Sequence, residues 1–285
     1  MDAASRLVGS LSNRSGIPRN TFVDSSLPGP LSELQIVARQ IATSTKSHRG
    51  WRPQVRERFG HVPVSEIYGA LLDKLISQGT HWLDVGGGHS VLPTNPSFAE
   101  ALARRAERLV VVDPSANVHK NHLAHERHQC LLEDYKNPGN FHVATLRMVA
   151  EHVTHPTELT RKLAELIRPG GLVAVLTPNK WSPASIGARL IPNSLHPMFT
   201  KLMSGRAEED TFPTVYRMNT RAQLRGVFSQ CGFAEERFWW LDDCSVLQQL
   251  KSLFVTQLAI SRVCGSLGLP FPENVLLGVY RRLPA

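Results

Sequence analysis

The chain has 285 residues, of which 42% are hydrophobic, and its 32 Lys and Arg against 24 Asp and Glu give a formal net charge of +8. This length and composition predict one large α/β domain with a sizeable core. No stretch approaches 18 consecutive apolar residues, which argues against a membrane span, and the first 20 residues hold no long apolar run, which argues against secretion.

The cysteines and the basic residues set two further limits. The four cysteines are scattered and form no C-x-x-C pair, so we expect neither a disulfide framework nor a zinc site, and a reducing cytoplasm fits this pattern. Part of the positive charge is concentrated in one segment, where a solvated basic face, an acidic substrate, an anionic membrane and nucleic acid are all open interpretations. The cations of that segment are Lys46, Arg49, Arg52, Arg56 and Arg58.

The N-terminal part differs in character from the rest of the chain. Residues 1–30 hold no periodic pattern and are interpreted as a flexible tail. Apolar residues at helical spacing then predict helices over residues 31–46 and 63–79. We expect all of residues 31–80 to contribute to the substrate side of a domain that spans residues 81–285.

From residue 81 short apolar runs alternate with helical segments. This alternation predicts a parallel sheet with its ligand at the carboxyl ends of the strands. Residues 178–217 interrupt it with several prolines and are interpreted as an insertion over those ends. Gly170 or Gly171 is expected to cap the helix that precedes the fifth strand, and Asn219 or Thr220 to begin a later one. We expect strands over residues 81–86, 108–113, 128–132, 141–147, 172–178, 234–241 and 275–282, and helices over residues 97–107, 115–125, 155–167, 219–233 and 246–263.

Three glycines follow the first expected strand in the string LDVGGGHSV. Gly86, Gly87 and Gly88 permit positive φ and leave room for a ligand to touch the backbone. A dinucleotide fingerprint, G-x-G-x-x-G, would need a glycine where Val91 stands. The pattern therefore favours a nucleoside over a pyrophosphate ligand, and it disfavours a Rossmann dehydrogenase.

An acidic residue closes the second expected strand. Asp113 stands where a carboxylate can accept hydrogen bonds from both ribose hydroxyls. A glycine turn alone is as compatible with a simple tight turn as with a ligand. The turn and the acid together, each at a strand end and in this order, predict a bound nucleoside.

Four segments of the sequence resemble segments of a known enzyme family. HWLDVGGGHS, VVVDPS, FHVATLRMVAEHVTHP and LIRPGGLVAVLTPN are similar, in order, to conserved segments of class I S-adenosylmethionine-dependent methyltransferases. The run E-H-V-x-x-P, R-P-G-G and T-P-N is typical of a small-molecule branch of that superfamily, the type 11 and 23 enzymes. The resemblance implies an α/β, Rossmann-like seven-stranded sheet of order 3-2-1-4-5-7-6, with an antiparallel strand 7 and helices on both faces.

The resemblance also implies which residues hold the cofactor S-adenosylmethionine and its product S-adenosylhomocysteine. Asp84 and the glycine turn would hold the methionine part, and Asp113 the ribose. The family usually has an Asp near the adenine, but Leu131 stands in that place. The full expected set is Asp84, Gly86, Gly87, Gly88, Asp113, Pro114, Glu133, Asp134, Leu146 and Arg147.

Two ionisable residues, Glu151 and His152, follow the fourth expected strand. One interpretation is structural: polar groups here order the next loop. The other makes His152 a catalytic general base for an acceptor hydroxyl, a task that suits an imidazole. Some similar quinone O-methyltransferases place several acids here and bind a divalent metal; because only Glu151 remains in this chain, we expect no metal.

The acceptor pocket should come from the insertion and from the helices before residue 80. Its candidate walls are Trp181, Phe212, Tyr216 and Arg217, although each aromatic residue could equally serve packing alone. His196 is a second candidate base. The acidic run Glu208–Asp210 could bind a cation or form a solvated turn.

These observations predict a cytoplasmic enzyme that methylates a small molecule, with a hydroxyl oxygen as the expected acceptor. The alternatives are a methyltransferase acting on nucleic acid or protein through the basic surface, and a non-catalytic relative of the fold. The segment after the fourth strand lacks the (N/D)-P-P-(Y/F) motif of base N-methyltransferases, which counts against nucleic acid. Peripheral contact with a membrane stays open, and the sequence names neither the acceptor nor the oligomeric state.

Overall fold

The computed structural model describes residues 30–44, 50–136, 138–190, 212–245, 247–269 and 271–284. Several sequence predictions therefore fall outside the described residues. They are the tail up to residue 29, the cations Lys46 and Arg49, the second candidate base His196, and the acidic run Glu208–Asp210.

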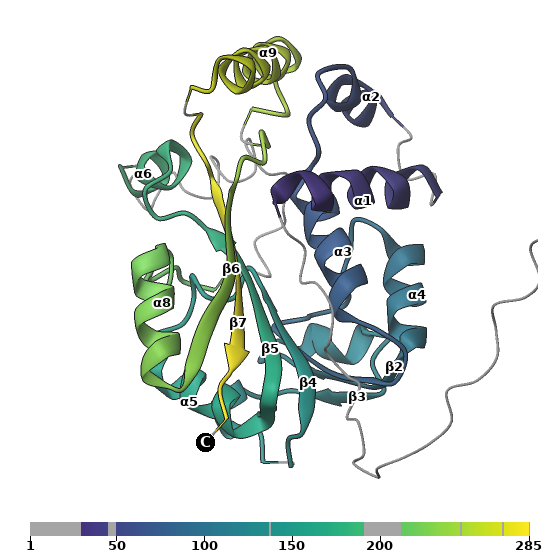
Figure 1. The fold of residues 1–285 in the computed structure, drawn as a ribbon, viewed down its shortest axis with the longest axis vertical. Coiled ribbons are helices and arrows are strands. Elements are labelled where there is room, and N and C mark those ends of the chain that lie inside the picture. Colours follow the sequence, from purple (N-terminus) through teal and green to yellow (C-terminus); the bar gives the residue numbers. More distant parts are fainter. Residues whose placement is uncertain are drawn as a thin grey trace, which may run out of the picture.

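A seven-stranded sheet forms the centre of the described chain, in the order β3-β2-β1-β4-β5-β7-β6 (Figure 1). Every strand except β7 runs in the same direction, since β7 pairs antiparallel with both β5 and β6. This arrangement confirms the predicted topology. The strands are β1 (Thr80–Val85), β2 (Ala106–Val112), β3 (Glu126–His128), β4 (Phe141–Arg147), β5 (Ile167–Pro178), β6 (Phe233–Leu241) and β7 (Val275–Arg282).

Each face of the sheet is covered by its own helices (Figure 1). Along β1, Trp82 joins the core that α1, α3 and α4 cover, and Leu83 joins the core beneath α5 and α8. Because successive side chains of a strand point to opposite faces, the unbroken apolar runs of the sequence are buried on both sides. These helices are α1 (Leu31–Ser44), α3 (Val64–Leu75), α4 (Pro96–Arg105), α5 (Pro156–Leu166) and α8 (Arg221–Gln230).

Three further helices stand beyond the carboxyl ends of the parallel strands (Figure 1). They are α2 (Trp51–Arg58), α6 (Pro183–Leu190) and α9 (Lys251–Leu267). None of the helices in the described residues combines the length and the apolarity that crossing a bilayer demands.

Some expected elements differ from those observed. The helix expected over residues 115–125 is a short 3-10 turn, η1 (Ala116–Lys120), because it buries only Val118 and so has no apolar face to pack. The helix α2 was not predicted, since its packing depends on a buried arginine rather than on an apolar stripe. The third strand begins at Glu126 and ends at His128, earlier than expected.

The helix before β5 also ends differently from the prediction. α5 stops at Leu166, and Ile167 is already extended and pairs with Phe141 of β4. Gly170 does have a positive φ of 79°, but it lies inside β5, where the register with β4 shifts. The glycine therefore accommodates an irregular strand and does not cap the helix. The N-cap at Thr220 is confirmed, since its side chain accepts a hydrogen bond from Gln223 N.

Candidate functional site

The glycine turn connects β1 to the loop before α4. Gly86 and Gly88 have φ values of 69° and 47°, a region that favours glycine. A Cβ atom at Gly86 would overlap the side chain of Val149, and a Cβ atom at Gly87 would overlap the carboxylate of Asp84. Only glycine thus lets this turn pass between the ends of β1 and β4.

Asp113 ties the end of β2 to the glycine turn. Its carboxylate is 6% exposed; Oδ2 accepts a hydrogen bond from Gly88 N (2.9 Å) and Oδ1 from Ser115 N (2.7 Å). A carboxylate has about four acceptor positions, so both oxygens keep capacity for a ligand hydroxyl. The acid and the turn are therefore one rigid unit.

Asp84 lies beneath this turn in an almost dry environment. Thr145, its register partner on β4, donates from Oγ1 to Asp84 Oδ1 (2.6 Å), and Trp82 Nε1 donates to Thr145 Oγ1 (2.7 Å). Asp84 Oδ2 is buried and has no hydrogen-bond partner among the described residues. Burial raises the pKa of Asp84 to about 7, against the opposing effects of the Thr145 hydrogen bond and the Arg147 charge. We call Asp84, Gly86, Gly87, Gly88 and Asp113 the cofactor edge.

A second group of polar residues begins just after β4. Glu151 is 5% exposed, and its Oε2 accepts from Thr177 Oγ1 (3.0 Å) at the end of β5. Asn219 Nδ2 in turn donates to Thr177 Oγ1 (2.7 Å). This chain of hydrogen bonds fixes the carboxylate of Glu151 at the carboxyl edge of the sheet.

His152 lies beside the carboxylate of Glu151. A backbone carbonyl can only accept, so His152 donates from Nδ1 to Pro213 O (3.0 Å) and carries its lone pair on Nε2. Nε2 lies 3.9 Å from Glu151 Oε1. An anchored imidazole with its basic nitrogen beside a carboxylate is an arrangement suited to accepting a proton.

Residues 212–217 bring candidate acceptor residues to this pair. Val215 N and Tyr216 N both donate to Glu151 O, at 2.7 and 3.2 Å. The ring centre of Phe212 lies 6.1 Å from that of His152, and Arg217 Nη1 donates to Thr154 O (2.6 Å). We call Glu151, His152, Thr177, Asn219 and residues 212–217 the acceptor side.

The fourth candidate wall residue, Trp181, stands apart from this contact set. Trp181 is 64% exposed, and the amino group of Lys180 lies 5.5 Å from the centre of its indole ring. The structure thus places Phe212 beside His152, bonds Tyr216 to Glu151 and Arg217 to Thr154, and leaves Trp181 at the surface.

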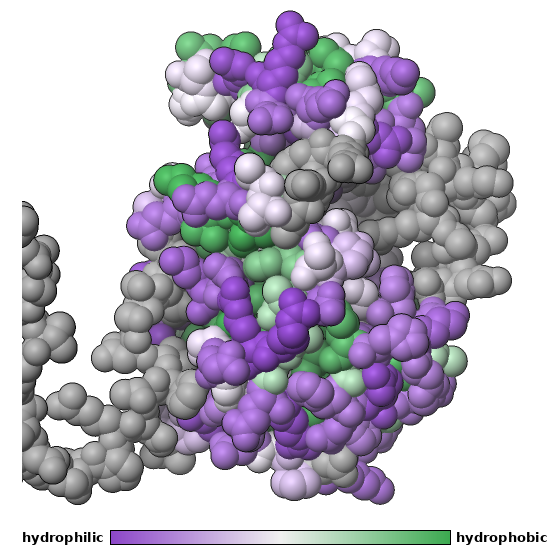
Figure 2. Space-filling model, turned by 90° about the vertical axis from the view of Figure 1, so that its right-hand side faces the viewer, coloured by the Kyte–Doolittle hydropathy of each residue, from purple (hydrophilic) through white to green (hydrophobic). Residues whose placement is uncertain are grey.

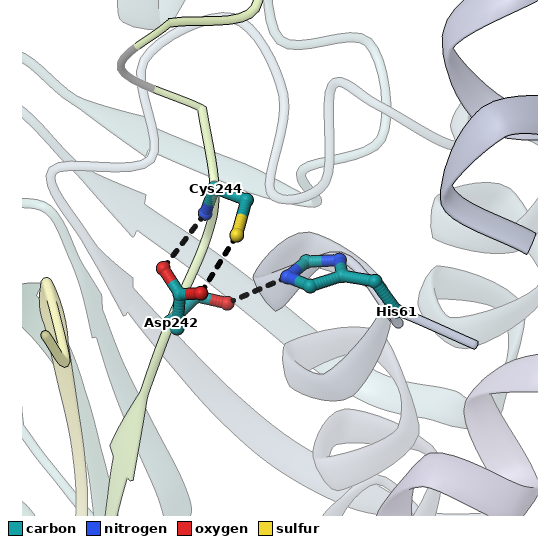
Figure 3. A group of neighbouring side chains, drawn as sticks. All are labelled: His61, Asp242 and Cys244. Atoms are coloured by element: carbon teal, nitrogen blue, oxygen red, sulfur yellow. Dashed lines mark hydrogen bonds between the residues drawn. The ribbon is translucent and has the colours of Figure 1, made fainter. Parts of the chain in front are cut away.

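A third polar group joins the exit of β6 to the loop between α2 and α3, and the sequence did not indicate it. His61, Asp242 and Cys244 face one another (Figure 3). Their potential metal-ligand atoms all lie within 4.8 Å of one another. His61 and Asp242 are 181 positions apart, so no local motif could reveal them.

The hydrogen bonds decide what this group can hold. The buried Arg56 donates from Nη1 to His61 Nδ1 (3.0 Å), because a guanidinium cannot accept. His61 then carries its proton on Nε2, which donates to Asp242 O (3.1 Å). A ring in this tautomer offers no lone pair at Nε2, and burial together with Arg56 lowers the pKa of His61. The group therefore ties β6 to α2 and is not arranged for a cation.

Comparison with known proteins supplies the family. A sequence model described as a methyltransferase domain matches residues 56–236, more than half of the chain. The chain belongs to this methyltransferase domain family. The predicted class of S-adenosylmethionine-dependent methyltransferases is thereby confirmed.

Individual relatives of this methyltransferase are more distant. Ubiquinone biosynthesis O-methyltransferase of Sodalis glossinidius is 29% identical over 157 residues, which cover 47% of this chain and 61% of the relative. The enzyme of the same name from Xanthomonas campestris is 28% identical over 41% of this chain and 54% of the relative. The chain thus spans between half and two thirds of the length of these relatives.

Solved structures are similar at still lower identity. N-methyltransferase NodS of Bradyrhizobium japonicum is 13% identical, with a TM-score of 0.45 over 82% of this chain and 98% of that one. Geranyl diphosphate C-methyltransferase of Streptomyces coelicolor is 12% identical, with a TM-score of 0.48 over 82% of this chain and 86% of that one.

The cofactor edge of the methyltransferase fits S-adenosylmethionine. The unpartnered buried oxygen of Asp84 matches a cationic ligand, and Asp113 keeps acceptor capacity for ribose hydroxyls. The turn is open where a ligand must approach, since a Cβ atom at Gly88 would meet nothing closer than 3.8 Å.

The other predicted cofactor residues lie around this edge. Pro114 and Asp134 are exposed, and Glu133 and Arg147 are half-buried. Leu146 is fully buried in the core beneath α5 and α8, so only its backbone reaches the carboxyl edge. The contacts of these five residues with a cofactor stay predictions.

Proposed function

We propose that this methyltransferase moves the methyl group of S-adenosylmethionine to a hydroxyl oxygen of a small molecule, with His152 as the general base. The observation that carries the proposal is the His152–Glu151 pair at the carboxyl edge of the sheet. It lies within a few residues of Val149, which packs against Gly86. The proton acceptor and the cofactor edge are therefore neighbours.

The residues of the cofactor edge would hold the donor. Asp113 would bind the ribose hydroxyls, and Asp84 with the glycine turn would bind the methionine part. Bound there, S-adenosylmethionine supplies an electrophilic methyl carbon. The protein must then align the acceptor and exclude water, and proximity alone supplies several kcal/mol of rate acceleration.

His152 would take the acceptor's proton. With Nδ1–H anchored to Pro213 O, the basic Nε2 is oriented, and the charge that it gains is stabilised by Glu151 Oε1 at 3.9 Å. Thr177 holds the other oxygen of Glu151 and keeps this carboxylate in position. An amine acceptor would need this base less, since a neutral amine nitrogen is a good nucleophile before it loses a proton, whereas a neutral hydroxyl is not.

One observation supports a small acceptor with a hydroxyl group. The relatives from Sodalis and Xanthomonas are named as O-methyltransferases. A hollow of about 170 Å³ opens between the N-terminal helices and the loop after the glycine turn, with walls that include Ile41, Pro53, Glu66, Leu92, Asn95 and Phe98. No residue of the acceptor side or of the cofactor edge lines this hollow, so it does not enter the proposal.

The test measures transfer of a labelled methyl group from S-adenosylmethionine to a panel of small phenols and to matched anilines. Hydroxyl compounds should be methylated and the anilines should not. His152→Gln should lower kcat about a hundredfold, a typical effect of losing a general base. Its cofactor affinity, measured by calorimetry, should stay within about twofold, because the variant leaves the cofactor edge intact.

Two results would count against the proposal. Equal methylation of phenols and anilines would remove the argument for a hydroxyl acceptor. Near-normal turnover of His152→Gln with a lowered melting temperature would instead assign His152 the structural role of ordering its loop.

A further inference from the structure

Helix α9 has two apolar faces, and only one of them is covered. Phe254 and Leu258 are buried against the rest of the chain, with at most 1% exposure. Successive residues of an α-helix are turned by about 100°, and this places exposed apolar side chains on the opposite side of α9, where they form a stripe. On the helix, the stripe consists of Leu253, Ile260, Val263 and Leu267, and Leu250 and Leu269 are exposed just beyond the two helix ends. All six side chains are 45 to 65% exposed, and we call them the α9 face.

An apolar stripe of this length is unusual on a protein surface. Single exposed apolar residues are ordinary, whereas contiguous ones mark a site of contact. Among the described residues, nothing packs on the α9 face closely enough to bury it.

Positive charge surrounds this stripe. α9 contains no Asp or Glu, and it carries Lys251 and Arg262. The neighbouring α2 adds Arg52 and Arg58 against the single acid Glu57. In Figure 2 the lobe at the top of the molecule, where both helices lie, presents hydrophobic residues beside strongly hydrophilic ones.

The described contacts of these cations leave their charge uncompensated. Arg52 donates to the neutral Gln249 side chain (2.6 Å), and Arg262 donates to the backbone carbonyl of Arg58 (3.1 Å). The amino group of Lys251 lies 5.5 Å from the ring centre of Trp51, which is 37% exposed. No ion pair with an acid involves them within the described residues. Helices α2 and α9 thus combine an apolar stripe and a partly exposed indole with an excess of Lys and Arg over acids.

We propose that the α9 face docks on an anionic membrane surface. Amphipathic helices with apolar side chains, flanking Lys or Arg and an interfacial Trp lie in the headgroup region of such membranes. A second copy of the chain is less suited, because a two-fold contact would bring the cations of two acid-free helices together.

Hydrogen bonds tie this lobe to the sheet. Arg56, His61 and the backbone of residues 242–244 tie α2 to the exit of β6, just before α9. The lobe also stands over the carboxyl ends of the parallel strands (Figure 1). The inference concerns binding alone and does not depend on which group is methylated.

The test is co-sedimentation of the full chain with vesicles. Vesicles of equal parts phosphatidylcholine and phosphatidylglycerol should retain the protein, vesicles of pure phosphatidylcholine should retain at least tenfold less, and raised ionic strength should release it. The double variant Ile260→Gln, Leu267→Gln should bind at least tenfold more weakly. Both side chains are exposed, so the variant should keep the melting temperature of the wild type.

Leu283→Gln is the matched control. Leu283 is also an exposed leucine, at 43%, but it follows β7 at the opposite end of the molecule (Figure 1). Its vesicle binding should equal that of the wild type. Absence of binding to anionic vesicles, or equal loss in the control and the double variant, would overturn the proposal. A dimer in ultracentrifugation that only the double variant dissociates would also overturn it, in favour of a second copy.

Discussion

The cofactor edge and the acceptor side lie at the same edge of one sheet, but they are built in different ways. The cofactor edge comes from the ends of two adjacent strands, and Asp113 bonds directly to the backbone of Gly88. The acceptor side joins segments about 60 positions apart, residues 151–154 and 213–217, through several hydrogen bonds to backbone carbonyls. A local string can encode the first arrangement; the second exists only after folding. Variants of the first should therefore change cofactor affinity, and variants of the second should change turnover.

The largest expected effect on cofactor affinity comes from Gly87→Ala. A Cβ atom there would overlap the Asp84 carboxylate and approach Val111 Cγ1 to 2.9 Å, and neither neighbour can move within the packed core. Overpacking of this kind costs about 1–3 kcal/mol, which the free protein can relieve by displacing the turn. Because the cofactor needs the turn in its original place, calorimetry should show affinity for S-adenosylmethionine reduced up to about a hundredfold. Gly226→Ala in α8 is the control, since its Cβ would meet open space. An unchanged affinity in Gly87→Ala would show that the turn is not packed as described.

The second prediction removes the ribose acid. Asp113→Ala deletes the acceptor of Gly88 N and the carboxylate proposed to bind the ribose. Loss of charge-assisted hydrogen bonds of this kind should weaken cofactor binding by more than about tenfold. Glu165→Ala, which alters an exposed acid of α5 outside the predicted cofactor set, is the comparison. If both variants bind equally well, the ribose is not held at Asp113.

The third prediction concerns the acceptor side. Glu151→Gln keeps an oxygen for the Thr177 hydrogen bond but removes the charge 3.9 Å from His152 Nε2. Because the carboxylate stabilises a proton on that nitrogen, kcat should fall about tenfold while cofactor affinity stays constant. Steady-state kinetics and calorimetry on the same preparation separate the two quantities. A loss of affinity equal to the loss of kcat would erase the distinction between the two regions.

The same contrast explains what the sequence could predict. The glycine turn, the acid after β2 and the strands over residues 141–147 and 275–282 were correct, because periodicity and strand-end position are local properties. The helix α2 and the His61 group were missed, since both depend on Arg56 contacts made across nearly 190 positions. Gly170 was misassigned because a positive φ serves a helix cap and an irregular strand alike.

The smallest expected effect is a pH dependence that only the cofactor edge should show. Burial raises the pKa of Asp84 to about 7 from its ordinary value of 3.8. In the cofactor-free protein, this raised pKa means that the protonated Asp84 favours the folded state. Its contribution to stability is complete below the pKa of the unfolded chain and is lost as the pH rises through the folded pKa of about 7. A cation that binds beside Asp84 prefers the ionised form, so its affinity should rise with pH.

Between pH 6 and pH 8 the affinity for S-adenosylmethionine should therefore increase about tenfold, as one protonation equilibrium centred near 7 requires. Asp84→Asn cannot ionise and should bind with little pH dependence, which also corrects for the titration of the cofactor's own amino group. His152→Gln, on the acceptor side, should keep the wild-type slope. If Asp84→Asn retains the slope instead, the unpartnered oxygen beneath the turn faces no cation, and the methionine part must be held by other groups.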